Sequence, residues 1–281
     1  MADKGRDAIA ARVDAEGPFD RALRRLRRGR AAALGGGADF LIRHMADDLV
    51  ERLDLVTRLF ADALVLGPDE GYLVQEMRAR GLAVTASDAD EDHLPFAPAS
   101  FDLILSAGAL DTVNDLPGAL IQIRRALRPD GLFLAAFFGA GSLPRLRSAM
   151  RAAEEAEGAS ASPRLHPQID VRAAGDLLTR AGFALPVADC EKLTIRFSSF
   201  ARLVADLRGI GATNILLTRD RRPFGRTGLA AATAAFEEEG GTVERFQIIH
   251  VSGWAPGPNQ PKAAPRGSGS ASLADALKPR G

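Results

Sequence analysis

The chain has 281 residues, and its 36 Lys plus Arg balance 36 Asp plus Glu, so no overall field attracts nucleic acid or an anionic membrane. The single cysteine excludes an intramolecular disulfide and a multi-cysteine zinc or iron–sulfur site, and the longest apolar run is too short to span a bilayer. We therefore expect a cytoplasmic protein in a reducing compartment, without a transmembrane segment or a DNA partner.

The N-terminal 38 residues form a basic arm. Residues 1–17 are mixed and small, whereas 18–33, PFDRALRRLRRGRAAA, predict a short basic helix. The sequence GGGAD then breaks the chain, and Asp39 suits a helix N-cap. Apolar residues recur at intervals of three or four from Leu41 to Phe60, which predicts an amphipathic helix.

Strands and helices then alternate along the chain. This alternation predicts an α/β sheet with right-handed crossovers. The expected elements are a strand at 64–66, a turn and a helix from Gly71, strands at 81–88 and 100–108, a helix at 116–127, a turn at 128–131 and a strand at 132–138.

The second half of the chain has looser spacing. We expect helices at 142–158 and 170–183, a strand at 187–197, inserted helices within 198–240 and a last strand at 243–255. The tail at 256–281 is rich in Pro, Gly and Ser and is predicted to be disordered. The chain thus divides into the arm at 1–38, one domain at 39–255 and this tail.

The turn after the first strand reads LVLGPDEGY and has two interpretations. An anion-binding turn works through free backbone N–H groups at a helix N-terminus. Pro68 removes one donor, and Asp69 and Glu70 place negative charge where an anion would lie. The segment between Gly67 and Gly71 is either a cofactor loop or a plain turn with acids favourable at the helix N-terminus.

Acidic residues follow the second strand. Asp88 lies about 20 residues past Gly67, the spacing at which a carboxylate binds ribose hydroxyls. The alternative is a solvated acid at a strand end. Asp90, Glu91 and Asp92 continue the run, which by itself is typical of an exposed loop.

An arginine cluster lies in the basic arm. It could dock an acidic protein, RNA or anionic lipid, or it could be a solvated helix face. No aromatic residue is interleaved to stack bases, which disfavours nucleic acid. The four scattered histidines suggest no metal site, and Ser106 and Ser142 lack the partners that nucleophilic catalysis needs. The cluster comprises Arg21, Arg24, Arg25, Arg27, Arg28 and Arg30.

Several stretches together resemble bacterial proteins of the class I S-adenosylmethionine-dependent methyltransferase superfamily. They are FDRALRRLRRGRAA at 19–32, the dense region at 94–139, LLTRAGFALP at 177–186, DLRGIGATN at 206–214 and VSGWAPGPNQ at 251–260. The nearest branch is related to the biotin-pathway carboxyl methyltransferase and to the mitochondrial complex I assembly factor described as an arginine hydroxylase. The resemblance implies a seven-stranded Rossmann-like sheet with an antiparallel last hairpin. The cofactor-side positions that it implies are Gly67, Gly71, Asp88, Asp90, Glu91 and Ser106.

The chain departs from this family at the cofactor turn. The family typically reads LDLGCGRGY where this chain has LVLGPDEGY, so Val65 replaces an acid, Pro68 a small residue and Asp69 the middle glycine. Downstream, ADEDHLPF at 89–96 aligns with the family's adenine-side ADEEFLPF. Too few residues precede this motif for the family's second strand, helix and third strand. One strand–helix unit is therefore predicted to be missing.

A third departure lies near the expected substrate mouth. The family's LHWVNDLP becomes LDTVNDLP, so Asp111 and Thr112 replace an imidazole and an indole. Three changes in one cleft indicate that a ligand site changed as a unit.

Three functions follow as hypotheses. The first is an S-adenosylmethionine-dependent methyltransferase with an unknown acceptor. The second is a cofactor-free scaffold, a pseudoenzyme acting in complex I assembly, that binds a protein client through the Arg21–Arg30 arm and the insertion at 198–240. The third is a protein arginine hydroxylase, although no cluster of iron ligands supports it. The oligomeric state stays open.

Overall fold

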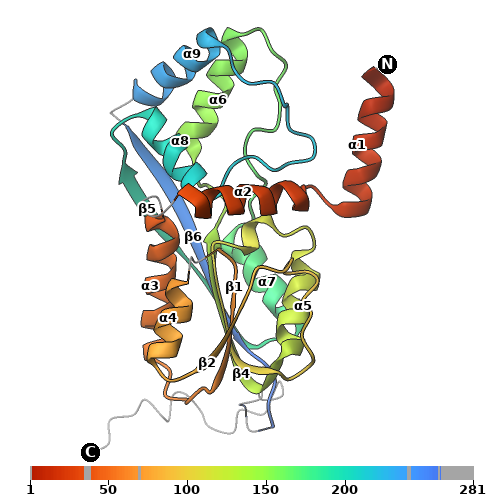
Figure 1. Cartoon of the computed structure of the whole chain (residues 1–281), viewed down its shortest axis with the longest axis vertical. Coiled ribbons are helices and arrows are strands. Elements are labelled where there is room, and N and C mark those ends of the chain that lie inside the picture. The colour runs from red at the N-terminus through yellow and green to blue at the C-terminus, as the bar shows by residue number, and fades with distance from the viewer. Residues whose placement is uncertain (1, 35–38, 69–70, 239–241, 259, 261–281) are drawn as a thin grey trace, which may run out of the picture.

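The computed structural model describes residues 2–34, 39–68, 71–238, 242–258 and 260 (Figure 1). Its strands form one six-stranded sheet in the order β2-β1-β3-β4-β6-β5. Adjacent strands pair in parallel from β2 to β4, whereas β6 pairs antiparallel with both β4 and β5. The strands are β1 (Asp62–Leu66), β2 (Ala83–Ser87), β3 (Phe101–Ala107), β4 (Leu127–Phe138), β5 (Ala184–Arg196) and β6 (Val243–Trp254).

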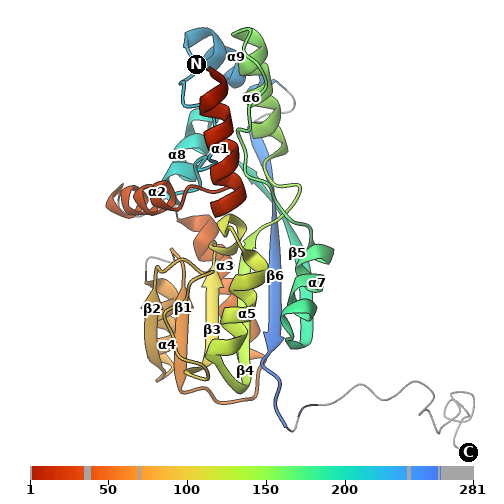
Figure 2. The same cartoon turned by 90° about the vertical axis from the view of Figure 1, so that its right-hand side faces the viewer.

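Two layers of helices cover the sheet (Figure 2). The helices α3 (Phe40–Asp54) and α4 (Tyr72–Ala79) pack on one face, and α5 (Leu116–Ala126) and α7 (Val171–Ala181) pack on the other. Strand β3 is buried along its whole length, as its continuous apolar run predicts for a strand covered on both faces. The alternation of strands and helices therefore predicts the α/β class correctly.

The edge of the sheet at β2 confirms the predicted loss of a strand–helix unit. Residues 88–100, between β2 and β3, contain neither a helix nor a strand. No strand of the described chain pairs with the outer side of β2. The sheet thus has six strands instead of the seven that the resemblance implies.

The long β5–β6 pair carries a group of helices beyond the sheet (Figure 1). These are α6 (Pro144–Ala156), α8 (Phe200–Gly209) and α9 (Arg226–Glu237). Both α8 and α9 lie between β5 and β6 in the chain, which confirms the predicted helical insertion before the last strand. Buried Phe200 and Phe236 join α8 to α9 with a ring-centroid separation of 5.5 Å.

The N-terminal arm consists of two helices, α1 (Ala2–Glu16) and α2 (Arg21–Leu34). The sequence predicts α2 but not α1, whose described side chains lie mostly in solvent. Helix α2 lies across the end of the sheet where the parallel strands finish (Figures 1 and 2). Backbone contacts hold its start, because Asp20 N–H donates to the carbonyl of Ile215 over 2.9 Å.

Two local predictions are wrong. The helix predicted to reach Phe60 ends at Asp54, and the last apolar residues of its pattern pack against the core from a loop. The segment 128–131 is part of β4 and not a separate turn. Asp130 has a φ of 63° there, and the β3–β4 register shifts at this point, so the turn residues form an irregularity within a strand.

Within the described residues, we find no helix of the length and apolar character needed to cross a membrane. Most of the tail predicted to be disordered, residues 261–281, lies outside the described residues.

Candidate functional site

A cavity of about 280 Å³ opens where β1 and β2 end and α2 crosses the sheet. Residues from five parts of the chain enclose it: the turn after β1, the end of β2, the arginine-rich face of α2, the start of α3 and the end of α8. Its volume is close to the smallest that is usual for small-molecule sites. Its lining includes Gly67, Pro68, Asp88, Arg25, Arg28 and Ile210.

The glycines of the turn play different parts. Gly67 donates its N–H to the carbonyl of Ser87 over 3.3 Å, and a Cβ built on it would lie 2.7 Å from the Cβ of Ala109. Close packing therefore requires this glycine. Gly71 precedes α4 with a φ of 91°, and a Cβ built on it would meet no atom within 4 Å. Asp69 and Glu70 lie outside the described residues.

Asp88 is exposed and lines this cavity directly after β2. The spacing argument thus places a carboxylate at the cavity that Gly67 also lines. A carboxylate accepts two or more hydrogen bonds, which suits a pair of vicinal hydroxyl groups.

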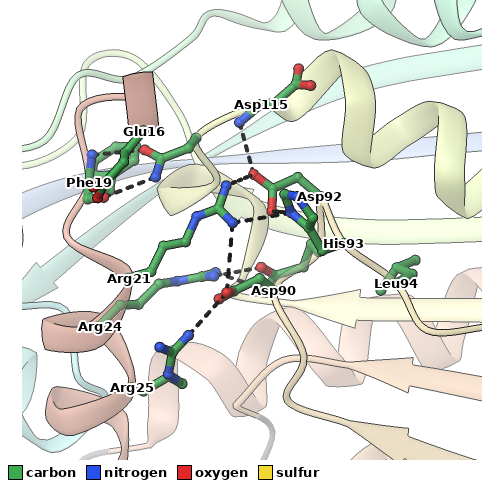
Figure 3. A network of polar contacts seen from close by, with 12 residues as sticks. Glu16, Phe19, Arg21, Arg24, Arg25, Asp90, Asp92, His93, Leu94 and Asp115 are labelled. Atoms are coloured by element: carbon green, nitrogen blue, oxygen red, sulfur yellow. Dashed lines mark hydrogen bonds and ion pairs between the residues drawn. The ribbon is translucent and has the colours of Figure 1, made fainter. Parts of the chain in front are cut away.

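Asp90 and Asp92, two of the acids that follow Asp88, face the arginines of α2 (Figure 3). Arg25 donates to Asp90 over 3.0 Å, and Arg21 donates to Asp92 over 2.5 Å. The cluster that the sequence offers as a docking surface for a client therefore makes several of its charge contacts within the chain.

The ion pair between Arg24 and Glu91 is the buried centre of this network. Two N–H groups of Arg24 donate to the two Glu91 oxygens over 2.5 and 2.8 Å, and the two residues are only 5% and 1% exposed. The same guanidinium donates to the carbonyl of Ala109 over 2.7 Å and to the hydroxyl of Thr112 over 3.0 Å. Helix α2 is thereby fastened to the segment after β3, where Thr112 stands in place of the family's indole.

Arg28 links this network to the cavity. Its Nη1 lies 3.6 Å from Glu91 Oε1, and its side chain lines the cavity. Burial lowers the pKa of Arg28, and the charge of Arg24 lowers it further. A guanidinium held in this way gains from a second negative group, such as a ligand carboxylate.

Five of the six predicted site residues fall into three groups, and the sixth, Gly71, is the N-cap of α4. Gly67 and Asp88 line the cavity, whereas Asp90 and Glu91 are paired with α2. Ser106 lies within β3, fully buried, and its hydroxyl has no hydrogen-bond partner in the described structure. Sequence reasoning missed the pairing itself, although opposite charge runs at 21–30 and 88–92 are the signal that could have indicated it.

Leu207 of α8 also lines a second cavity, of about 70 Å³. Burial raises the pKa of Asp111 to about 6, and the positive charge of Arg24 only partly opposes this effect. Asp111 is the acid that replaces the family's imidazole. The lining includes Asp111, Phe138, Leu165, His166, Gln168 and Leu207.

His166 in the same cavity has a structural task. Its Nε2 accepts a hydrogen bond from the Ile215 N–H over 3.1 Å, and its ring meets the ring of Phe19 edge-on at 5.3 Å. Burial lowers its pKa to about 4, so the ring is neutral near pH 7. The histidine therefore joins the start of α2 to the loop after α8.

The chain is similar to two groups of known proteins. The methyltransferase domain family matches residues 34–135. The mitochondrial arginine-hydroxylase NDUFAF5 of Danio rerio is 35% identical over 259 residues, with 88% of this chain and 75% of the relative covered. The Homo sapiens protein of that name is 32% identical over 284 residues, with coverages of 92% and 82%. The malonyl-[acyl-carrier protein] O-methyltransferase of Laribacter hongkongensis is 29% identical over 263 residues, with coverages of 81% and 86%.

Proposed function

Since this chain belongs to the class I methyltransferase superfamily, in the branch of the NDUFAF5 and malonyl-carrier-protein methyltransferase relatives, we propose that its larger cavity binds S-adenosylmethionine. The observation that carries the proposal is the meeting of Gly67 and Asp88 at one cavity, at the ends of adjacent parallel strands. Nucleotide-type ligands bind at this edge of open α/β sheets.

The residues at the cavity fit part of this cofactor. Asp88 would accept hydrogen bonds from the ribose hydroxyls, and Arg28 would pair with the carboxylate of the methionine end. The apolar side chains of Ile42 and Ile210 would cover the base. When bound, S-adenosylmethionine supplies an electrophilic methyl group, and the protein's task is to hold the acceptor in line with it.

A second candidate is a cofactor-free assembly factor, with respiratory complex I as the assembly that the sequence resemblance suggests. The arginine network favours it, because Asp90 and Glu91, the acids at the family's adenine-side positions, are already neutralised by α2. In this case the fold supports a client-binding surface and the cavity stays without a cofactor.

Titration calorimetry and thermal unfolding with S-adenosylmethionine and its demethylated product decide between the two. A site filled at 100 times its dissociation constant adds about 2.7 kcal/mol to the free energy of unfolding. We expect binding by the wild type, at least tenfold weaker binding by Asp88→Asn and unchanged binding by Asp176→Asn. Asp176 is an exposed acid on α7 and serves as the matched control.

The absence of heat and of a thermal shift at millimolar ligand would overturn the cofactor proposal and leave the assembly-factor candidate. Equal losses in the two aspartate variants would show that the ligand does not use Asp88.

A further inference from the structure

The second cavity, around Asp111, has no part in cofactor binding as proposed above. Its walls come from the 3₁₀ turn η1 (Leu110–Thr112), from residues 143–168, and from α8 with the loop that follows it. The two cavities share the end of α8 as a wall, because Leu207 lines the second and Ile210 lines the first. Residues three positions apart at the end of one helix thus line the two cavities.

Several polar residues around this cavity already have partners. Arg164 Nε lies 2.8 Å from Glu154 Oε1, and its Nη2 lies 3.7 Å from Asp220 Oδ2. Asn214 donates to the carbonyl of Pro163 and accepts from the N–H of Leu216. Together with the hydrogen bond from Ile215 to His166, these contacts leave little free hydrogen-bonding capacity in those groups.

Asp111 and Gln168 differ from them. Within the part of the chain that the structure describes, the Asp111 carboxylate has no ion-pair partner within 4.0 Å, and the Gln168 amide makes no hydrogen bond. The nearby guanidinium of Arg24 is taken by Glu91, Ala109 and Thr112. Partial burial disfavours the charge of the Asp111 carboxylate, and the nearby charges of Arg24 and Arg28 offset this only in part.

The remaining walls are apolar. A carboxylate and an amide oxygen beside aliphatic and aromatic side chains match a ligand with an aliphatic stem and a donor-rich cationic end. An acidic ligand is disfavoured, since it would place two carboxylates together. A volume of about 70 Å³ has room for a few water-sized groups, enough for the cationic end of a ligand. The apolar side chains are Phe138, Leu143, Leu146, Leu165, Leu207 and Ala212.

We propose that this second cavity binds the ammonium or guanidinium end of an aliphatic amine or side chain, with Asp111 pairing with the cation and Gln168 accepting one of its N–H groups. Its role as the acceptor site beside the cofactor rests on the proposed function, whereas cation binding itself does not. The substitution of Asp111 for the family's imidazole then changes the kind of group that this site recognises.

Binding of three small probes tests the cavity: agmatine for guanidinium, cadaverine for ammonium and malonate for a carboxylate. Two-dimensional NMR of the ¹⁵N-labelled full chain at pH 7.5 follows each titration. We expect agmatine or cadaverine to shift amide signals around 111, 166–168 and 212–214, and malonate to leave them unchanged. Asp111→Asn should weaken the binding of the cation at least tenfold, and Asp176→Asn should leave it unchanged.

Three results would overturn the proposal. They are malonate binding at these amides, cation binding that Asp111→Asn leaves unaltered, and no shift with either cation at 50 mM. The S-adenosylmethionine titration of the same variants separates the two proposals. Asp111→Asn should lose cation binding and keep cofactor affinity. A wild type that binds the cofactor but neither cation contradicts only the second cavity, and a wild type that binds a cation but no cofactor contradicts only the first.

Discussion

Asp111→Asn should stabilise the protein at neutral pH. The ordinary pKa of the carboxyl is 3.8, and burial raises it to about 6 in the folded chain. One pKa unit corresponds to about 1.36 kcal/mol, so ionised Asp111 destabilises the fold by up to about 3 kcal/mol. Asparagine has nearly the same shape without the charge, so the variant should gain about 1–3 kcal/mol.

The size of the effect depends on pH in a defined window. Below pH 3.8 the carboxyl is protonated in both the folded and the unfolded chain, and the charge has no cost. Between 3.8 and about 6 the unfolded chain ionises first, so the cost grows, and above 6 it is complete. The advantage of Asp111→Asn should therefore be full at pH 7.5 and small at pH 4.

Urea unfolding of the wild type, Asp111→Asn and the control Asp176→Asn at both pH values measures these differences. The wild type and each variant are compared at the same pH, so acid effects from other groups cancel. A loss of more than about 1 kcal/mol in Asp111→Asn at pH 7.5 would refute the reasoning, because it would mean that the ionised carboxylate has a stabilising partner.

Three further changes test the packing around the site. Arg24→Ala should cost about 3–5 kcal/mol in urea unfolding, because it leaves the buried Glu91 carboxylate unpaired, and a cost below 1 kcal/mol would contradict the buried pair. Burial lowers the pKa of His166 from 6.5 to about 4, so the unfolded chain takes up a proton first as the pH falls from 6.5 to 4. The wild type should therefore lose up to about 3 kcal/mol of unfolding free energy over this range, and His166→Gln should be less acid-sensitive in the same assay. Gly108→Ala should lower stability by about 1–3 kcal/mol in thermal unfolding, since the residue has a φ of 66° and a Cβ would lie 2.2 Å from Ile42; an unchanged melting temperature would count against this.

The sequence predicts the sheet well because local patterns set its elements. Continuous apolar runs give β3 and the core of β4, and the short interval before 89–96 predicts the missing unit. Helix α1 is missed because the described part of it buries little apolar surface, so no periodic face marks it.

The site is harder to predict because its contacts join distant segments. Asp88 follows from spacing along one chain segment, whereas the pair of Arg24 and Glu91 joins residues 67 positions apart. No local pattern distinguishes an arginine that faces solvent from one that crosses the end of a sheet. The enclosure of Asp111 likewise depends on α8 and the 143–168 segment, which only the folded chain brings together.

The arginine network of α2 and the unpaired Asp111 suggest how the cleft has changed. Where Asp90 and Glu91 meet arginines, their charges are balanced and the contacts fasten α2 over the sheet. Where Asp111 lies, the charges of Arg24 and Arg28 only partly offset burial, and the ionised carboxylate costs up to about 3 kcal/mol, a sizeable part of the 5–15 kcal/mol by which domains are usually stable. Selection for stability alone favours a neutral residue at such a position, and costs of this kind collect where a ligand later supplies the missing partner. The unpaired acid is therefore the more informative of the two features, since it points to a ligand that brings positive charge to the second cavity.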